Sequence, residues 1–156
     1  MTGSLQLIAI KTGKYYSKNL ICSNFTKQIS LNRILTGCYD STIHLWNLDG
    51  THRLTVPGHC GPIKGVRWVE TDEPHANFAS VSDDETVMFW KIDLASETVE
   101  CIQIGQGHER AINFVDVNKN ASFLVTGGWD NMLKIWRASN NSFFTFKIFS
   151  TDSSSN

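Results

Sequence analysis

Short runs of β-branched and aromatic residues, separated by Gly and Asx residues, recur along the chain. In the clearest case, Phe123–Arg137 (FLVTGGWDNMLKIWR), two apolar runs flank the turn-forming segment Trp129–Asn131. Such runs predict two short β-strands joined by a tight turn. Segments at Ile34–Trp46 and Phe78–Trp90 align with it without gaps around an aspartate. The pattern therefore predicts three β-hairpins.

Each hairpin carries the same three side-chain types at fixed intervals: a hydroxyl residue, then an aspartate, then a tryptophan. The three sets are Thr36, Asp40, Trp46; Ser80, Asp84, Trp90; and Thr126, Asp130, Trp136. The aspartates recur about every 44 to 46 residues, a period typical of β-propeller repeats. A Gly-His pair precedes the second and third hairpins, at Gly58-His59 and Gly107-His108.

These features resemble the WD-repeat family, whose signature is Gly-His near the start of a repeat and Trp-Asp near its end. The terminal Asp is replaced here by Asn47, Lys91 and Arg137. The resemblance implies an all-β fold: a partial WD-repeat β-propeller of about three four-stranded antiparallel blades, with the ring not closed. The expected organisation is a leader strand at 1–16, three WD repeats over 17–137 (17–47 degenerate, 56–91 and 105–137), and at 138–156 an outer strand followed by a disordered Ser-rich tail.

In the family, the histidine, hydroxyl, aspartate and tryptophan of a blade form a buried hydrogen-bond relay. Buried polar groups are tolerated when they are mutually satisfied. The resemblance implies one relay of His59, Ser80, Asp84 and Trp90, and a second of His108, Thr126, Asp130 and Trp136. In the first blade Ser17 takes the histidine position, so Thr36, Asp40 and Trp46 are expected to lack an imidazole. That blade is expected to be the least stable.

The same residue types also resemble the catalytic triad of a hydrolase. A nucleophilic serine needs an exposed hydroxyl on a strained turn and an oxyanion hole, and no Gly-x-Ser-x-Gly occurs. Repetition in each blade favours a structural role, so no catalytic residue is assigned and an enzyme is not expected. His44, His52 and His75 lack metal-ligand spacing and are expected at the surface. Neither a metal nor a cofactor is expected.

Aromatic residues stand directly before two of the turn aspartates. Tyr39 and Trp129 could lie on a partner-binding face or pack in the core, and the sequence does not separate the two. Together with Arg110 they are the candidate partner-binding residues. Trp68 is expected to serve packing.

Composition narrows the class of protein. The 156 residues carry a formal net charge of -1, which argues against binding dominated by nucleic-acid phosphates. The four cysteines are scattered without a Cys-x-x-Cys pair, so buried free thiols of an intracellular protein are expected. Leu5–Ile10 is too short for a membrane span. We expect a soluble protein without membrane contact or sequence-specific nucleic-acid binding.

A narrower resemblance is carried by Gly128–Trp136, Ile34–Gly50 and Ile63–Val69, which are similar to the WD-repeat subunits of pescadillo-type complexes. It implies a non-catalytic scaffold for protein–protein interaction in large ribosomal subunit assembly and rRNA maturation. The implied partners are a pescadillo-type complex and pre-ribosomal particles, in the nucleus and nucleolus, with the nucleoplasm as an alternative. The alternative function is another WD-repeat adaptor, such as a ubiquitin-ligase substrate receptor. That family also carries a ubiquitin-like domain, for which these residues leave no room.

Three hairpins are too few for a closed propeller, because rings need about four to eight blades. The chain is therefore expected to be a fragment or truncated product of a longer propeller. In isolation it is expected to self-associate or to be marginally stable. The phenylalanine-rich segment Ser142–Phe149 is expected to form an exposed strand that favours association.

Overall fold

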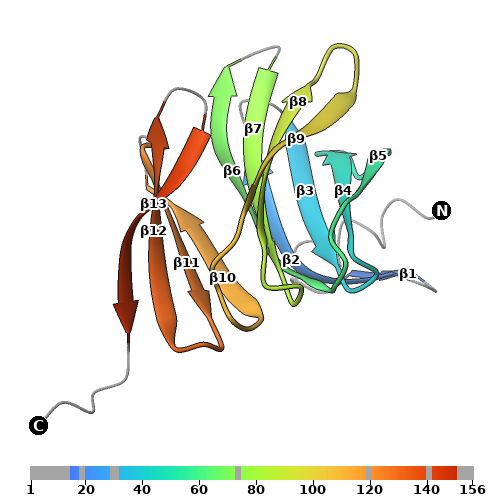
Figure 1. Ribbon diagram of the computed structural model, residues 1–156. Coiled ribbons are helices and arrows are strands. Elements are labelled where there is room, and N and C mark those ends of the chain that lie inside the picture. The colour runs from blue at the N-terminus through green and yellow to red at the C-terminus, as the bar shows by residue number, and fades with distance from the viewer. Residues whose placement is uncertain are drawn as a thin grey trace, which may run out of the picture.

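The computed structural model describes residues 15–17, 20–28, 32–72, 75–118, 121–139 and 142–150, with side chains at 32–69, 75–118, 121–137 and 148–150. All regular elements in these ranges are β-strands, and they form three antiparallel sheets (Figure 1). This confirms the expected all-β fold with three blade-like sheets. Within the described ranges, no helix is long and apolar enough to cross a membrane.

Blade 1 has one strand more than the four expected. Its strands pair in chain order: β1 (Tyr15–Ser17), β2 (Leu20–Gln28), β3 (Arg33–Cys38), β4 (Thr42–Asn47) and β5 (His52–Pro57). The additional strand, β1, pairs antiparallel with β2, and Ser17 lies opposite Leu20. Ser17 therefore belongs to a strand, whereas His59 and His108 lie outside strands, ahead of the inner strands of their blades.

Blades 2 and 3 have four strands each, also in chain order. Blade 2 consists of β6 (Ile63–Asp72), β7 (His75–Ser82), β8 (Val87–Asp93) and β9 (Thr98–Gly105). Blade 3 consists of β10 (Ile112–Val117), β11 (Phe123–Gly128), β12 (Met132–Ser139) and β13 (Ser142–Ser150). Strands β6 and β7 extend into the polar segment Thr71–Ala76, which from its composition resembles a loop. The expected outer strand Ser142–Phe149 is confirmed as β13. Residues 1–14 and 151–156 lie outside the described ranges.

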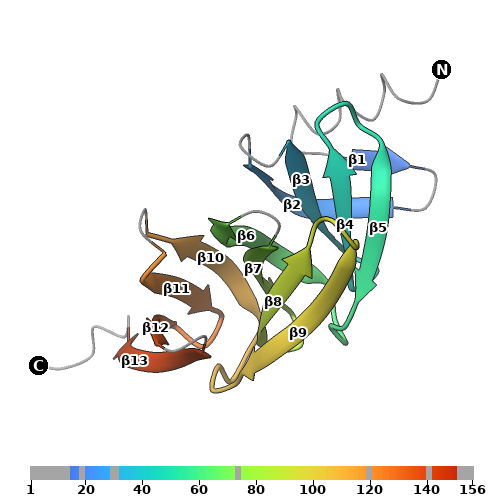
Figure 2. The same ribbon diagram turned by 90° about the horizontal axis from the view of Figure 1, so that it is seen from above.

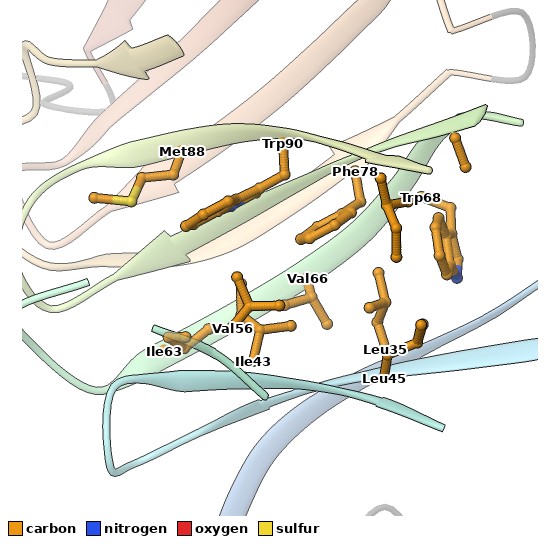
Figure 3. Close-up of a cluster of buried hydrophobic side chains, with 12 residues drawn as sticks. Leu35, Ile43, Leu45, Val56, Ile63, Val66, Trp68, Phe78, Met88 and Trp90 are labelled. Atoms are coloured by element: carbon orange, nitrogen blue, oxygen red, sulfur yellow. The ribbon is translucent and has the colours of Figure 1, made fainter. Parts of the chain in front are cut away.

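The three sheets follow one another in an arc (Figure 2). The inner strand of blade 2, β6, contacts the inner strands of both neighbours, β2 and β10. Between blades 1 and 2 a core cluster brings Leu35, Ile43 and Leu45 against Phe78 and Trp90 (Figure 3). Phe78 and Trp90 stack, with ring centroids 5.8 Å apart. Apolar burial between sheets therefore joins the blades.

A second core cluster joins blades 2 and 3. Its members are Ala79, Val81, Val87, Phe89, Ile112, Val115, Leu124 and Trp136. Gly65 in β6 lets the sheets approach, because a Cβ there would lie 2.7 Å from Val115 Cγ1 and 3.0 Å from Val81 Cγ2. Trp68 is buried in the first cluster, as expected for a packing residue.

Equivalent positions of the three blades differ in burial. Ile43, Val87 and Leu133 each stand three residues after the turn aspartate of their blade. In blades 1 and 2 this position faces the next blade along the chain. Ile43 and Val87 are 0% exposed because the next blade covers them, whereas Leu133 of blade 3 is 38% exposed. Within the described residues, the corresponding face of blade 3 is therefore uncovered.

The β3–β4, β7–β8 and β11–β12 turns share one backbone conformation. The residue after each aspartate has a left-handed φ: 69° at Ser41, 69° at Glu85 and 58° at Asn131. Each aspartate accepts a hydrogen bond from the amide two residues on, which is the geometry of an Asx turn. All three turns lie at the lower end of the blades in Figure 1.

Candidate functional site

A continuous chain of hydrogen bonds crosses blade 2 from the core to the turn. Trp90 Nε1 donates to Ser80 Oγ (2.8 Å), and Ser80 Oγ lies 2.7 Å from His59 Nε2. His59 Nδ1 lies 2.8 Å from Asp84 Oδ2, which also accepts from the Cys60 amide (2.9 Å). Ser80 and the His59 side chain are fully buried. The four residues that the resemblance groups together are thus in contact.

Blade 3 repeats the chain. Trp136 Nε1 donates to Thr126 Oγ1 (2.9 Å), which lies 2.8 Å from His108 Nε2. His108 Nδ1 lies 2.8 Å from Asp130 Oδ2, and the same oxygen accepts from the Glu109 amide (3.1 Å). A side chain at Gly128 would obstruct this relay, because a Cβ there would lie 2.9 Å from His108 Nδ1.

The donors and acceptors fix the direction of the relay. A carboxylate only accepts, so His59 Nδ1 carries a proton and donates to Asp84 Oδ2. Burial lowers the pKa of His59, so at pH 7 the ring is neutral and its Nε2 carries no proton. His59 Nε2 therefore accepts from the Ser80 hydroxyl, whose oxygen accepts from the indole N–H of Trp90. The same reasoning holds in blade 3.

The pKa shifts agree with a neutral imidazole beside a carboxylate. Burial lowers the pKa of His59 and of His108, and this outweighs the opposing effect of their aspartate partners. Burial alone would raise the pKa of Asp84, but bonds from Thr86, Cys60 and His59 bring it below its usual value. The His–Asp contacts, although 2.8 Å long, are thus neutral-donor hydrogen bonds rather than ion pairs.

Blade 1 contains a different network. Trp46 Nε1 still donates to Thr36 Oγ1 (3.0 Å). Asp40 is exposed and accepts from the amide and hydroxyl of Thr42, at 3.1 and 2.6 Å. Thr42 Oγ1 lies 2.9 Å from Nε2 of His44 in β4. An imidazole from within the hairpin therefore reaches the turn aspartate through a threonine, a connection that the sequence did not reveal.

The remaining histidines are only partly as expected. His52 and His75 are exposed, as predicted. His44 is 7% exposed, so its expected surface position is wrong. It alternates in phase with Trp46 along β4, and on this face of the sheet it contacts the side chains of His52 and Thr55 from β5. Burial and the neighbouring His52 lower the pKa of His44, and Asp40 opposes them.

The cysteines also depart from expectation. Cys60 and Cys101 are free but exposed, not buried. Cys38 is disulfide-bonded, so it is not a free thiol. Cys22 is its Cα partner across β2 and β3. Sequence spacing gave no sign that Cys38 is disulfide-bonded.

Two threonines that sequence reasoning missed complete the turns. Thr86 Oγ1 donates to Asp84 Oδ1 (2.7 Å), as Thr42 does to Asp40. An Asp-x-Thr pattern shared by the first two hairpins was the available signal. In blade 3 the position is Met132, and only its amide contacts Asp130 (3.1 Å).

The relay offers no reactive group to a substrate. Ser80 and Thr126 are 0% exposed, and each hydroxyl is engaged by a tryptophan and a histidine. A nucleophile must be reachable by the atom it attacks. The relay can join three parts of one blade into a rigid unit: the segment before the inner strand, the two central strands and the turn between them.

The candidate partner-binding residues all lie on the surface. Tyr39 is 49% and Trp129 is 66% exposed, and Arg110 is exposed as well. Lys64 Nζ sits 4.6 Å from the centre of the Tyr39 ring and 3.1 Å from Asp83 Oδ2. Blades 1 and 2 thus present a linked aromatic and charged group beside their turns.

The chain is similar to proteins named for ribosome biogenesis. It is 50% identical over 105 residues to "Ribosome biogenesis protein WDR12 homolog" of Culex quinquefasciatus and of Drosophila virilis. It is 51% identical over 106 residues to the protein of that name from Ixodes scapularis. Each match covers 67% of this chain, and the chain spans about a quarter (25%) of the length of these relatives.

The family model of the WD domain, G-beta repeat, matches residues 19–47, 50–91 and 99–137. These ranges cover most of the chain and contain the three hairpins with their aspartate–tryptophan pairs. The matched repeats, the three antiparallel sheets and the recurring turn geometry agree with one another. The chain belongs to the WD40 family of G-beta repeat proteins.

Proposed function

We propose that this chain is part of a non-catalytic scaffold that binds other proteins during assembly of the large ribosomal subunit and maturation of its rRNA. The proposal rests on the sequence identity of about 50% to proteins named for ribosome biogenesis. The corresponding location is the nucleolus. The partners proposed are a pescadillo-type complex and pre-ribosomal particles.

The proposed binding face is the end of the blades that carries the β3–β4 and β11–β12 turns. Exposed aromatic side chains on a rigid framework favour association, because they bury much area at low entropy cost. Tyr39 and Trp129 are such side chains, and each directly precedes an aspartate of the turn network. Arg110 adds a cation that can pair with a partner's carboxylate. A rigid turn that displays an aromatic ring supports binding rather than catalysis.

Affinity purification from eukaryotic cells tests this function. The tagged chain is expected to recover pescadillo and pre-ribosomal proteins. The Tyr39→Ala, Trp129→Ala double variant is expected to lose at least tenfold of that recovery. Lys91→Ala removes an exposed side chain near the opposite end of blade 2 and is the matched control. Circular dichroism on each variant verifies folding.

Two outcomes would separate the alternatives. Recovery of ubiquitin-ligase subunits instead of pre-ribosomal proteins would replace the assembly role with a substrate-receptor role. Recovery of pre-ribosomal proteins that is equal for the wild type and the double variant would keep the assembly role but reject the turn face as its binding surface.

A further inference from the structure

Two imidazole rings meet on the face of blade 1 that is turned away from blade 2. His44 of β4 and His52 of β5 approach with Nδ1 and Nε2 3.1 Å apart. Thr55 Oγ1 lies 3.0 Å from His44 Nδ1 and 3.3 Å from His52 Nε2. Three donor atoms from two neighbouring strands therefore converge on one point. His52 and Thr55 are exposed, so this point is accessible from solvent.

The hydrogen bonds of His44 determine which of its nitrogens is available. A carboxylate only accepts, so the Thr42 hydroxyl proton points to Asp40 Oδ1, 2.6 Å away. Thr42 Oγ1 must then accept from His44 Nε2, 2.9 Å away. The proton of the neutral ring is thus held on Nε2, and the lone pair of Nδ1 faces His52 and Thr55.

We propose that His44 Nδ1, His52 Nε2 and Thr55 Oγ1 form a binding site for a divalent transition-metal ion of the zinc, nickel or copper class. Imidazole nitrogens are favoured ligands of these ions. Two nitrogens that bind one ion at about 2.0–2.1 Å, with an angle between right-angled and tetrahedral, lie about 2.9–3.4 Å apart. The separation of 3.1 Å falls within this range.

The surroundings of the ligands have the features of a built site. A metal-binding histidine ordinarily donates its other ring N–H to a carboxylate, a backbone carbonyl or a water, and this bond fixes the ring and its tautomer. The His44–Thr42–Asp40 chain provides this support. The Trp46 ring packs edge-on against His52, with centroids 4.8 Å apart, and restricts its orientation. Water would complete the coordination of the ion.

A second group of possible ligands lies on the other side of His44 but suits an ion less well. Cys38, Asp40 and His44 place ligand atoms within 4.8 Å of one another. Cys38 is disulfide-bonded and supplies no thiolate. On that side His44 Nε2 already donates to Thr42. The ion is therefore assigned to the side of the ring that faces His52.

Calorimetric titration of the full chain with Zn²⁺ tests the site. The wild type is expected to bind one equivalent, and His52→Ala to bind at least tenfold more weakly. Thr42→Val keeps both imidazoles but removes the support, and its affinity is expected to fall about tenfold. His75→Ala removes an exposed imidazole from blade 2 and is expected to stay within twofold of the wild type.

Loss of affinity in Thr42→Val distinguishes a built site from an accidental pair of surface histidines. Absence of wild-type binding, or binding by His52→Ala within twofold of the wild type, would overturn the proposal. If His52→Ala fails to fold, electron paramagnetic resonance of wild-type chain loaded with one equivalent of Cu²⁺ decides. Two coupled imidazole nitrogens are expected, and a spectrum without nitrogen coupling would reject the site.

Discussion

Removal of the blade 3 turn carboxylate by Asp130→Ala measures what the relay contributes to stability. Asp130 accepts three hydrogen bonds: from His108 Nδ1 at 2.8 Å, from the Glu109 amide at 3.1 Å and from the Met132 amide at 3.1 Å. A buried donor left without a partner costs about 1–3 kcal/mol. The His108 side chain is fully buried, so its N–H cannot turn to water.

The two amides lie beside exposed residues and regain part of their bonding from solvent. Counting one full loss for His108 and partial losses for the amides, we expect Asp130→Ala to lower the free energy of unfolding by about 2–4 kcal/mol. Urea unfolding, followed by circular dichroism and tryptophan fluorescence, measures the change.

Asp40→Ala is the matched control, because Asp40 holds the same repeat position but is exposed and, among the described residues, accepts hydrogen bonds from Thr42 alone. Its expected cost is below about 1 kcal/mol. Equal losses in the two variants, or a loss below about 0.5 kcal/mol for Asp130→Ala, would refute the claim that the relay stabilises blade 3.

Three further predictions follow from burial and packing. The free energy of unfolding is expected to fall as the pH drops below 6.5, the ordinary histidine pKa. Folding lowers the pKa of His59 and His108, so below pH 6.5 the unfolded chain binds more protons than the folded one. A free energy of unfolding in urea that stays constant from about pH 7 to about pH 5 would contradict this. Ile43→Ala is expected to lower the free energy of unfolding by about 2–5 kcal/mol. Leu133→Ala is expected to lower it much less, because Ile43 is fully buried and Leu133 is partly exposed. Similar melting temperatures for the two variants would show that the face of blade 3 is covered. Gly65→Ala is expected to cost about 1–3 kcal/mol in the same unfolding assay, because its Cβ would lie 2.7 Å from a valine of blade 3; unchanged stability would mean that the blades separate easily.

The sequence revealed the repeated parts of the molecule well. The constant interval between Asp84 and Trp90, and between Asp130 and Trp136, reflects a hairpin whose turn and register are the same in each blade. Because residues of one face alternate along a strand, fixed spacing identifies which side chains share that face. The three hairpins could therefore be predicted from a single chain.

Features that depend on contacts between strands could not be predicted in the same way. The burial of His44 follows from the position of β5, and the proximity of Cys38 to Cys22 follows from the register of β2 and β3. Strand β1 falls in a polar segment without clear alternation. The sequence also did not determine whether Tyr39 and Trp129 are exposed, because an aromatic residue before a turn can point to the core or to solvent.

The central claim is that the buried histidines are neutral links in a structural relay that holds the turn face rigid. Nitrogen NMR of the imidazole rings of His59 and His108 at pH 7 tests it most directly, because protonated and unprotonated ring nitrogens have distinct chemical shifts. The expected result is a neutral ring with the proton on Nδ1, which donates to Asp84 or Asp130, and an unprotonated Nε2, which accepts from Ser80 or Thr126. A doubly protonated ring, or a proton on Nε2 alone, would contradict the direction of the relay.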